Sequence, residues 1–409
     1  MAERAGRLAF QPGHIGNLEI KNRLVRSATY ENAATHSGYV TDALIDLYKQ
    51  LAGGGAGLIV TGIAGVYPEA LAPHLMMRAD ADDFIPGLRS LTRAVHALDN
   101  GCRIMLQLHH PGRQIMAPEA SPPPMPPALW AYLERSGYVP PPPTGPLPEP
   151  TAPSAIFDAT FNRTPRALEV EEIEAIIAAY AQGIRRAREA GFDGVQLHAA
   201  HGWLLSAFMS PHTNRRDDNY GGSTGNRVRI VREICTRGHQ EAGIDFPILI
   251  KMNTTDFFED GTDLEESARV GKLLAETGFA ALETSGGMWE STTRSEDELG
   301  WPPVLLPESR TGIKTREQEA YFLPGAEAVK KAVDVPVILV GGIRSASRIE
   351  EILASGAADF VALSRPLIRQ PDLPNRWLSG DGPDKAACIS CNACLPLGDL
   401  PTGCKAVKK

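Results

Sequence analysis

Two histidines stand at the end of a β-rich run, in the segment His198-Ala-Ala-His201. Imidazoles at this spacing could bind a metal ion, polarise a substrate carbonyl or complete a buried polar network. The spacing alone does not choose among the three. Catalytic groups gather where the strands of parallel α/β proteins end, so this position favours a functional role.

Other strand ends carry groups that suit a phosphorylated heterocycle. Gln107 offers an amide that could pair with a heterocycle edge, and Lys251 offers a cation. Gly341 and Gly342 let the backbone approach a ligand closely, and Arg365 could clamp a phosphate. The alternative for these last groups is a tight turn and a surface arginine. Taken together, the set favours a phosphorylated heterocyclic cofactor, for which flavin mononucleotide (FMN) is the natural candidate.

Four of the six cysteines fall close together near the C-terminus, at Cys388, Cys391, Cys394 and Cys404. Such spacing indicates metal binding before disulfides. Four thiolates suit a [4Fe-4S] cluster or zinc, and unligated thiols are the remaining alternative.

The elements that must position these groups alternate between short β-rich runs and helical periodicity. Eight strands are expected, at residues 24–30, 56–62, 102–110, 194–200, 247–254, 281–287, 335–342 and 360–365. Each is followed by a plausible helix, and the clearest helix spans 170–189, where isoleucines recur at spacings of three and four. Eight β-then-α units in series predict a (β/α)₈ TIM barrel.

Two segments depart from the alternation. A Pro-rich insertion at 118–153 follows the third strand, and a Cys-rich tail at 381–409 follows a barrel expected to span 1–380. The insertion leaves from the catalytic end, so it could line the substrate entrance; the alternative is a surface loop.

Composition limits the partners. The net charge of −8 argues against a nucleic acid or an anionic membrane, and a small-molecule substrate is expected. The sequence shows neither an apolar run long enough to span a membrane nor an N-terminal secretion signal, so we expect a cytoplasmic protein. The oligomeric state stays open.

Several segments resemble the Old Yellow Enzyme family, in order along nearly the whole chain. They are KNRLVRSATY (21–30), QLHHPGR (107–113), GFDGVQLHAAHGWLLSAFMSPHTNRRDDNYGGSTGNR (191–227), ILIKMNTTDF (248–257) and VGGIRS (340–345). The resemblance implies an FMN-containing (β/α)₈ barrel that takes hydride from NAD(P)H and reduces an activated alkene. His198 and His201 would hold the electron-withdrawing oxygen of the substrate, and Lys251 would stabilise the reduced flavin.

The resemblance also implies a set of residues around FMN. They are Ser27, Ala28, Thr29, Tyr30, Gly62, Gln107, Lys251, Gly341, Gly342, Ser364 and Arg365.

One position departs from the family pattern. The residue two after the second His or Asn of the pair is usually a proton-donating Tyr, and here it is Trp203. An indole N–H is not an acid near neutral pH. We therefore expect Tyr30, another group or water to supply the proton, or a reaction other than alkene reduction.

The cysteine run resembles the cluster segment of trimethylamine dehydrogenase and 2,4-dienoyl-CoA reductase, although its last spacer is shorter. A bound cluster would call for an electron-transfer partner.

Two alternative functions stay open. One is an FMN dehydrogenase, with or without iron and sulfur, acting on an amine or alcohol. The other is a metal-dependent lyase or hydrolase that uses His198 and His201 as ligands.

Overall fold

The computed structural model describes residues 7–68, 75–115, 149–304, 306–395 and 400–406. Within them, parallel strands close into a barrel: β3 (Leu24–Arg26), β4 (Leu58–Gly65), β6 (Arg103–His109), β9 (Gly194–Ala199), β10 (Ile248–Asn253), β11 (Ala281–Ser285), β12 (Val337–Leu339) and β13 (Phe360–Leu363). Strand β3 pairs with both β13 and β4, which closes the ring. The predicted TIM barrel is confirmed, and each of the eight expected strands is present.

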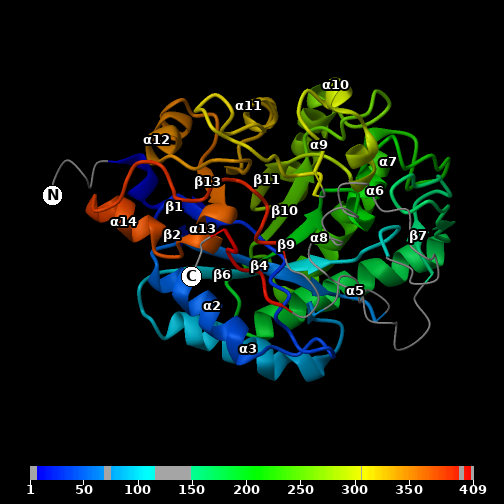
Figure 1. The fold of residues 1–409 in the computed structure, drawn as a ribbon. Helices are drawn as coiled ribbons and strands as arrows, with labels where there is room; N and C mark the ends of the chain where they lie inside the picture. The colour runs from blue at the N-terminus through cyan, green and yellow to red at the C-terminus, as the bar shows by residue number, and fades with distance from the viewer. Residues whose placement is uncertain (1–6, 69–74, 116–148, 305, 396–399, 407–409) are drawn as a thin grey trace.

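Helices surround the barrel (Figure 1). The longer ones are α2 (Asp42–Gly53), α3 (Ile85–His96), α5 (Val170–Glu189), α8 (Arg229–Ala242), α9 (Leu264–Thr277), α11 (Leu323–Lys330), α12 (Ala346–Ala354) and α14 (Leu373–Ser379). The shorter ones are η1 (Leu8–Phe10), η2 (Asp82–Phe84), η3 (Trp289–Thr293), α6 (Leu204–Met209), α7 (Thr224–Arg227), α10 (Glu296–Leu299) and α13 (Arg365–Arg369). Helix α5 has the predicted bounds, because a capping box of Glu169 and Glu172 starts it and its isoleucine face is buried.

Short strands outside the barrel were not predicted. Strands β1 (Gly13–Ile15) and β2 (Leu18–Ile20) form a hairpin whose Ile15 and Ile20 pack into the barrel interior. Strand β5 (Met77–Arg78) pairs with β4 in parallel, and β7 (Thr151–Ala152) pairs with β8 (Arg166–Ala167). Of the Pro-rich insertion, residues 118–148 lie outside the described residues.

The barrel interior is built in layers, because alternate residues of each strand point inward. The layer beside the hairpin is apolar and includes Met105, Leu249 and Ala281. Two residues further along the same strands come Gln107, Lys251 and Glu283, and two further come His109, Asn253 and Ser285. The interior therefore changes from apolar to polar toward the C-terminal ends of the strands.

The C-terminal tail lies against the loop that follows β3. Thr402 Oγ1 donates to the carbonyl of Tyr30 at 2.6 Å, and the Thr402 N–H donates to the carbonyl of Glu31 at 2.9 Å. Asn32 Nδ2 donates to the carbonyl of Leu400 at 2.8 Å. Among the helices of the described residues, none is long and apolar enough to cross a membrane.

Candidate active site

A connected polar layer fills the centre of the barrel. Gln107 Nε2 donates to Gln196 Oε1 at 2.8 Å, and Gln196 Nε2 donates to Glu283 Oε2 at 2.7 Å. Ser27 Oγ donates to Glu283 Oε1 at 2.7 Å, and Lys251 Nζ donates to Ser27 Oγ at 2.9 Å. Lys251 Nζ also lies 3.1 Å from Glu283 Oε1. Three predicted cofactor residues, Ser27, Gln107 and Lys251, are thus brought together, and the Lys251 cation has a buried counterion.

The predicted histidine pair lies one layer above. His198 Nε2 and His201 Nδ1 are 3.2 Å apart, and His201 Nε2 is 2.8 Å from Ser285 Oγ. Burial lowers the pKa of both imidazoles well below the ordinary value, and the Lys251 charge lowers both further. Both rings are therefore neutral near pH 7.

His201 is held by its backbone. Its φ of +66° lies in the left-handed region, which is uncommon for a residue with a side chain. The His201 N–H donates to Asn253 Oδ1 at 3.0 Å, and the His201 carbonyl accepts from Gln114 Nε2 at 3.0 Å. These two bonds offset the cost of the conformation and fix the direction of the ring.

Trp203 forms part of an aromatic wall above the histidines. Its ring meets His109 edge-on, with centroids 4.6 Å apart and an interplanar angle of 80°, and it lies 6.1 Å from the ring of Trp289. Trp289 in turn lies 6.2 Å from Phe161. The other proposed proton source, Tyr30, donates its phenolic hydrogen to Asn32 Oδ1 at 2.6 Å.

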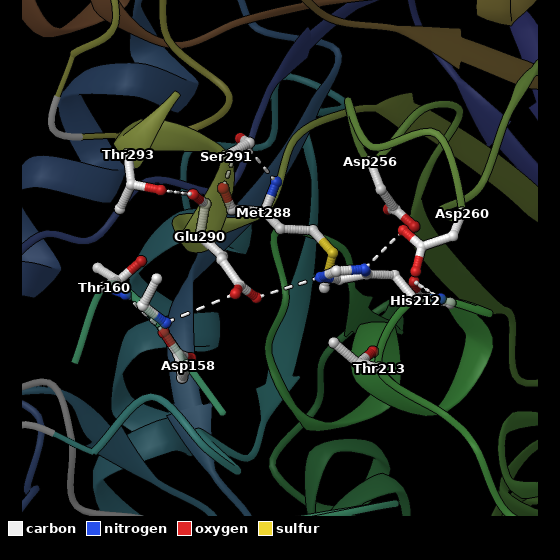
Figure 2. Close-up of polar contacts among 12 residues, drawn as sticks. Asp158, Thr160, His212, Thr213, Asp256, Asp260, Met288, Glu290, Ser291 and Thr293 are labelled. Carbon is white, nitrogen blue, oxygen red and sulfur yellow. Dashed lines mark hydrogen bonds and ion pairs between the residues drawn. The ribbon is translucent and has the colours of Figure 1, made fainter. Parts of the chain in front are cut away.

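Ionic contacts from three segments anchor η3, which carries Trp289. Glu290 Oε2 accepts from Arg113 Nη2 at 2.9 Å. Glu290 Oε2 also lies 3.3 Å from His212 Nε2, as Figure 2 shows. His212 Nδ1 lies 2.8 Å from Asp260 Oδ1, and Arg113 Nε donates to Asp158 Oδ2 at 2.6 Å. The aromatic wall is therefore tied to the loops that follow β6, β9 and β10.

The predicted phosphate end is assembled at the ends of β12 and β13. Gly341 and Gly342 have φ values of +132° and +69°, which a side chain would strain. Ser364 Oγ lies 2.8 Å from Thr29 Oγ1. Arg365 Nη1 donates to the Arg310 carbonyl at 2.9 Å and to Asn392 Oδ1 at 2.6 Å, so its guanidinium also contacts the tail.

Two residues of the predicted cofactor set remain, Ala28 and Gly62. Ala28 packs against the barrel interior, and the Gly62 N–H donates to Tyr48 Oη at 2.8 Å.

The donor set fits FMN. An amide and an ammonium group suit the pyrimidine edge of a flavin, and a guanidinium beside two left-handed glycines suits a phosphate. Glu308 lies within the influence of both ends: burial raises the pKa of Glu308, and the charges of Lys251 and Arg365 both oppose this rise.

The four tail cysteines line one pocket together with Arg365 and Arg369. Arg369 Nη1 lies 3.9 Å from Cys404 Sγ. Among the described residues, no group of three or more His, Cys, Asp or Glu side chains is arranged to hold a single metal ion.

The sequence reasoning missed four residues of the polar layers: His109, Gln196, Glu283 and Ser285. The alternation of the strands could have found them. His109 lies two residues after Gln107, and the other three are paired with residues of a neighbouring strand that point into the barrel. His109 Nδ1 is 3.2 Å from His198 Nδ1.

Comparison with known proteins agrees with this site. A family model described as the NADH:flavin oxidoreductase / NADH oxidase family matches residues 9–381. The chain is 37% identical over 384 residues to an NADH oxidase of Thermoanaerobacter brockii and 33% identical over 389 residues to a metal reductase of Desulforamulus reducens. These alignments cover 94% and 95% of this chain and 52% and 51% of the relatives, so the chain spans about half their length.

Two solved structures are similar. A 2-naphthoyl-CoA reductase complex has a TM-score of 0.79 at 26% identity, over 95% of this chain and 54% of that one. An old yellow enzyme homologue from Zymomonas mobilis has a TM-score of 0.70 at 25% identity, over 92% of this chain and 94% of that one. The resemblance seen in the sequence is confirmed.

Proposed function

Because this chain belongs to the NADH:flavin oxidoreductase / NADH oxidase family, we propose that it is an FMN-dependent oxidoreductase that takes hydride from NAD(P)H and reduces an activated alkene or related electrophile. The observation that carries the proposal is the stack of two interior layers, with Gln107 and Lys251 below and His198 and His201 above. FMN, when bound, would accept hydride from NAD(P)H and pass it to the substrate.

The protein residues would bind FMN and stabilise the negative charge that develops on the substrate. Gln107 and Lys251 would hold the pyrimidine edge of FMN, and Arg365 with Gly341 and Gly342 would hold its phosphate. Imidazole N–H groups of His198 and His201 would donate to the substrate oxygen and stabilise the enolate-like charge that develops there. The aromatic wall of Trp203 and Trp289 would exclude water from this charge.

The experiment separates the two half-reactions of the purified protein. We expect a flavin absorption spectrum, its bleaching by NADH or NADPH without oxygen, and its return on addition of cyclohexenone. His198→Ala and His201→Ala should keep FMN but slow the return by roughly a hundredfold or more. A protein that binds no flavin, or two variants as fast as the parent, would contradict the proposal.

A second proposal concerns the tail. We propose that Cys388, Cys391, Cys394 and Cys404 hold a [4Fe-4S] cluster, because all four thiols line one pocket. A cluster would suit a dehydrogenase of an amine or alcohol with an external electron partner, which is the alternative function. Iron and sulfide content of anaerobically purified protein tests it. Zinc in place of iron, or no bound metal, would contradict it.

A further inference from the structure

Three buried imidazoles and one hydroxyl form a hydrogen-bonded chain across the C-terminal end of the barrel. His109 Nδ1 is 3.2 Å from His198 Nδ1, His198 Nε2 is 3.2 Å from His201 Nδ1, and His201 Nε2 is 2.8 Å from Ser285 Oγ. Both ring nitrogens of His198 and of His201 therefore take part in the chain. Each of these three hydrogen bonds uses one hydrogen. Because a neutral imidazole carries a hydrogen on only one of its two nitrogens, the direction of one bond fixes the direction of the next.

Neutral imidazoles allow only two patterns along this chain, because each ring has one donor and one acceptor nitrogen. In the first pattern His198 Nδ1–H donates to His109, His201 Nδ1–H donates to His198, and Ser285 donates to His201. In the second, His109 Nδ1–H donates to His198, His198 Nε2–H donates to His201, and His201 Nε2–H donates to Ser285. Burial lowers the pKa of His198 and His201, which keeps these two rings neutral.

We infer that His109 is a positioning residue that donates from Nδ1 to His198 and thereby sets His198 in the Nε2–H tautomer. The inference rests on the proposed function, in which a substrate oxygen binds at this pair. A carbonyl or enolate oxygen only accepts hydrogen bonds, so at His198 it needs the Nε2 hydrogen that the second pattern places there, and it is repelled by the bare His198 Nε2 of the first pattern. The hydrogen that selects the second pattern belongs to His109.

The place of His109 in the fold supports this role. It is the last residue of β6 and fully buried, and its ring meets the edge of Trp203. Rigid placement on a strand and against an aromatic ring holds Nδ1 toward His198. A hydrogen-bond partner that fixes the tautomer of a functional histidine is a common requirement in metal and acyl-transfer sites.

The test uses two replacements of nearly equal shape. Asn has an amide that can donate from a position close to that of Nδ1, and Leu cannot donate. His109→Asn should still donate to His198 and keep the second pattern. His109→Leu removes this donor, so His198 should no longer be held in one tautomer. His14→Leu is the matched control, because His14 is exposed on β1 at the far end of the barrel.

The first readout needs no turnover. In flavin-loaded protein labelled with ¹⁵N at histidine, and assigned with His198→Ala and His201→Ala, His198 should carry its proton on Nε2. His109→Asn should preserve this signature, and His109→Leu should shift His198 toward a mixture of tautomers. A proton on Nδ1 of His198 in the parent would overturn the inference.

The second readout is affinity for a phenol such as p-hydroxybenzaldehyde, followed by the change in the flavin spectrum. His109→Leu should weaken binding about tenfold or more, and His109→Asn should restore most of the loss. Equal affinity in the parent, the Asn and the Leu variants would also overturn it. If instead the tautomers behave as expected while the parent neither binds phenols nor reduces cyclohexenone, the proposed function fails and the inference about His109 stands.

Discussion

Trp203 replaces the residue from which a phenolic proton would come. Its indole N–H donates a hydrogen bond but does not ionise near neutral pH, whereas a phenol has a pKa of about 10. We expect reoxidation of the reduced flavin by cyclohexenone to limit turnover, and Trp203→Tyr to accelerate that step by about 10²-fold. Stopped-flow measurement of the two half-reactions checks this. Fast reoxidation in the parent with no gain in the variant would mean that Tyr30 or water already protonates the substrate efficiently.

Lys251 provides a second prediction for a single residue, because its counterion Glu283 is fully buried. Lys251→Met leaves that carboxylate without its cation, which costs about 3–5 kcal/mol in similar buried pairs. It also removes the positive charge that would stabilise reduced flavin. We expect a lower midpoint in urea and a lower flavin reduction potential. Lys251→Met with Glu283→Gln removes the pair, so it should recover part of the stability and separate the two effects.

The strands show what could be predicted at the scale of elements. Short β-rich runs that alternate with helical periodicity located all eight barrel strands, and the apolar periodicity of residues 170–189 gave the bounds of α5. The alternation of each strand also determines which residues point into the barrel. In β6 these are Met105, Gln107 and His109, at every second position. His109 was missed because a His-His dipeptide does not reveal which ring points inward until the phase of the strand is known.

Contacts between loops could not be predicted in the same way. Glu290 binds Arg113 and His212, which are far from it in sequence and lie in irregular segments without periodicity. The β1–β2 hairpin was missed for a related reason. Its strands are too short to show a pattern, and only the barrel interior buries Ile15 and Ile20.

The contacts of η3 predict a pH dependence. Burial alone would lower the pKa of His212, but hydrogen bonds to Glu290 and Asp260 raise it overall. A raised pKa adds stability that is complete below the unfolded value of about 6.5 and is lost as pH rises through the folded value. The free energy of unfolding should therefore fall above pH ~6.5, by on the order of 1 kcal/mol or less because Asp260 is half-exposed. Urea unfolding across this range should show the fall in the parent and its loss in His212→Gln. An unchanged pH profile in the variant would assign the fall to other groups.

At the scale of the whole molecule, the tail and the barrel opening share side chains. Arg365 is the first residue of α13, just after β13, and contacts Asn392, while Thr402 binds the loop that follows β3. The predicted phosphate clamp and the cysteine pocket thus meet at one guanidinium. Events in the tail should therefore reach the cofactor site without any large movement of the barrel.

Cys391→Ser tests this connection. Cys391 is exposed, so the change should leave the fold intact while it removes one of the four thiols. We expect the variant to lose iron and also to release flavin faster on dilution, because a tail without its cluster would hold Asn392 less firmly against Arg365. Leu378→Ser, at an exposed position of α14 that does not line the cysteine pocket, is the control and should change neither property. Iron content and flavin retention after gel filtration give the answer. Loss of iron with flavin held as tightly as in the parent would show that the two sites are independent, and Arg365 would then bind the phosphate without support from the tail.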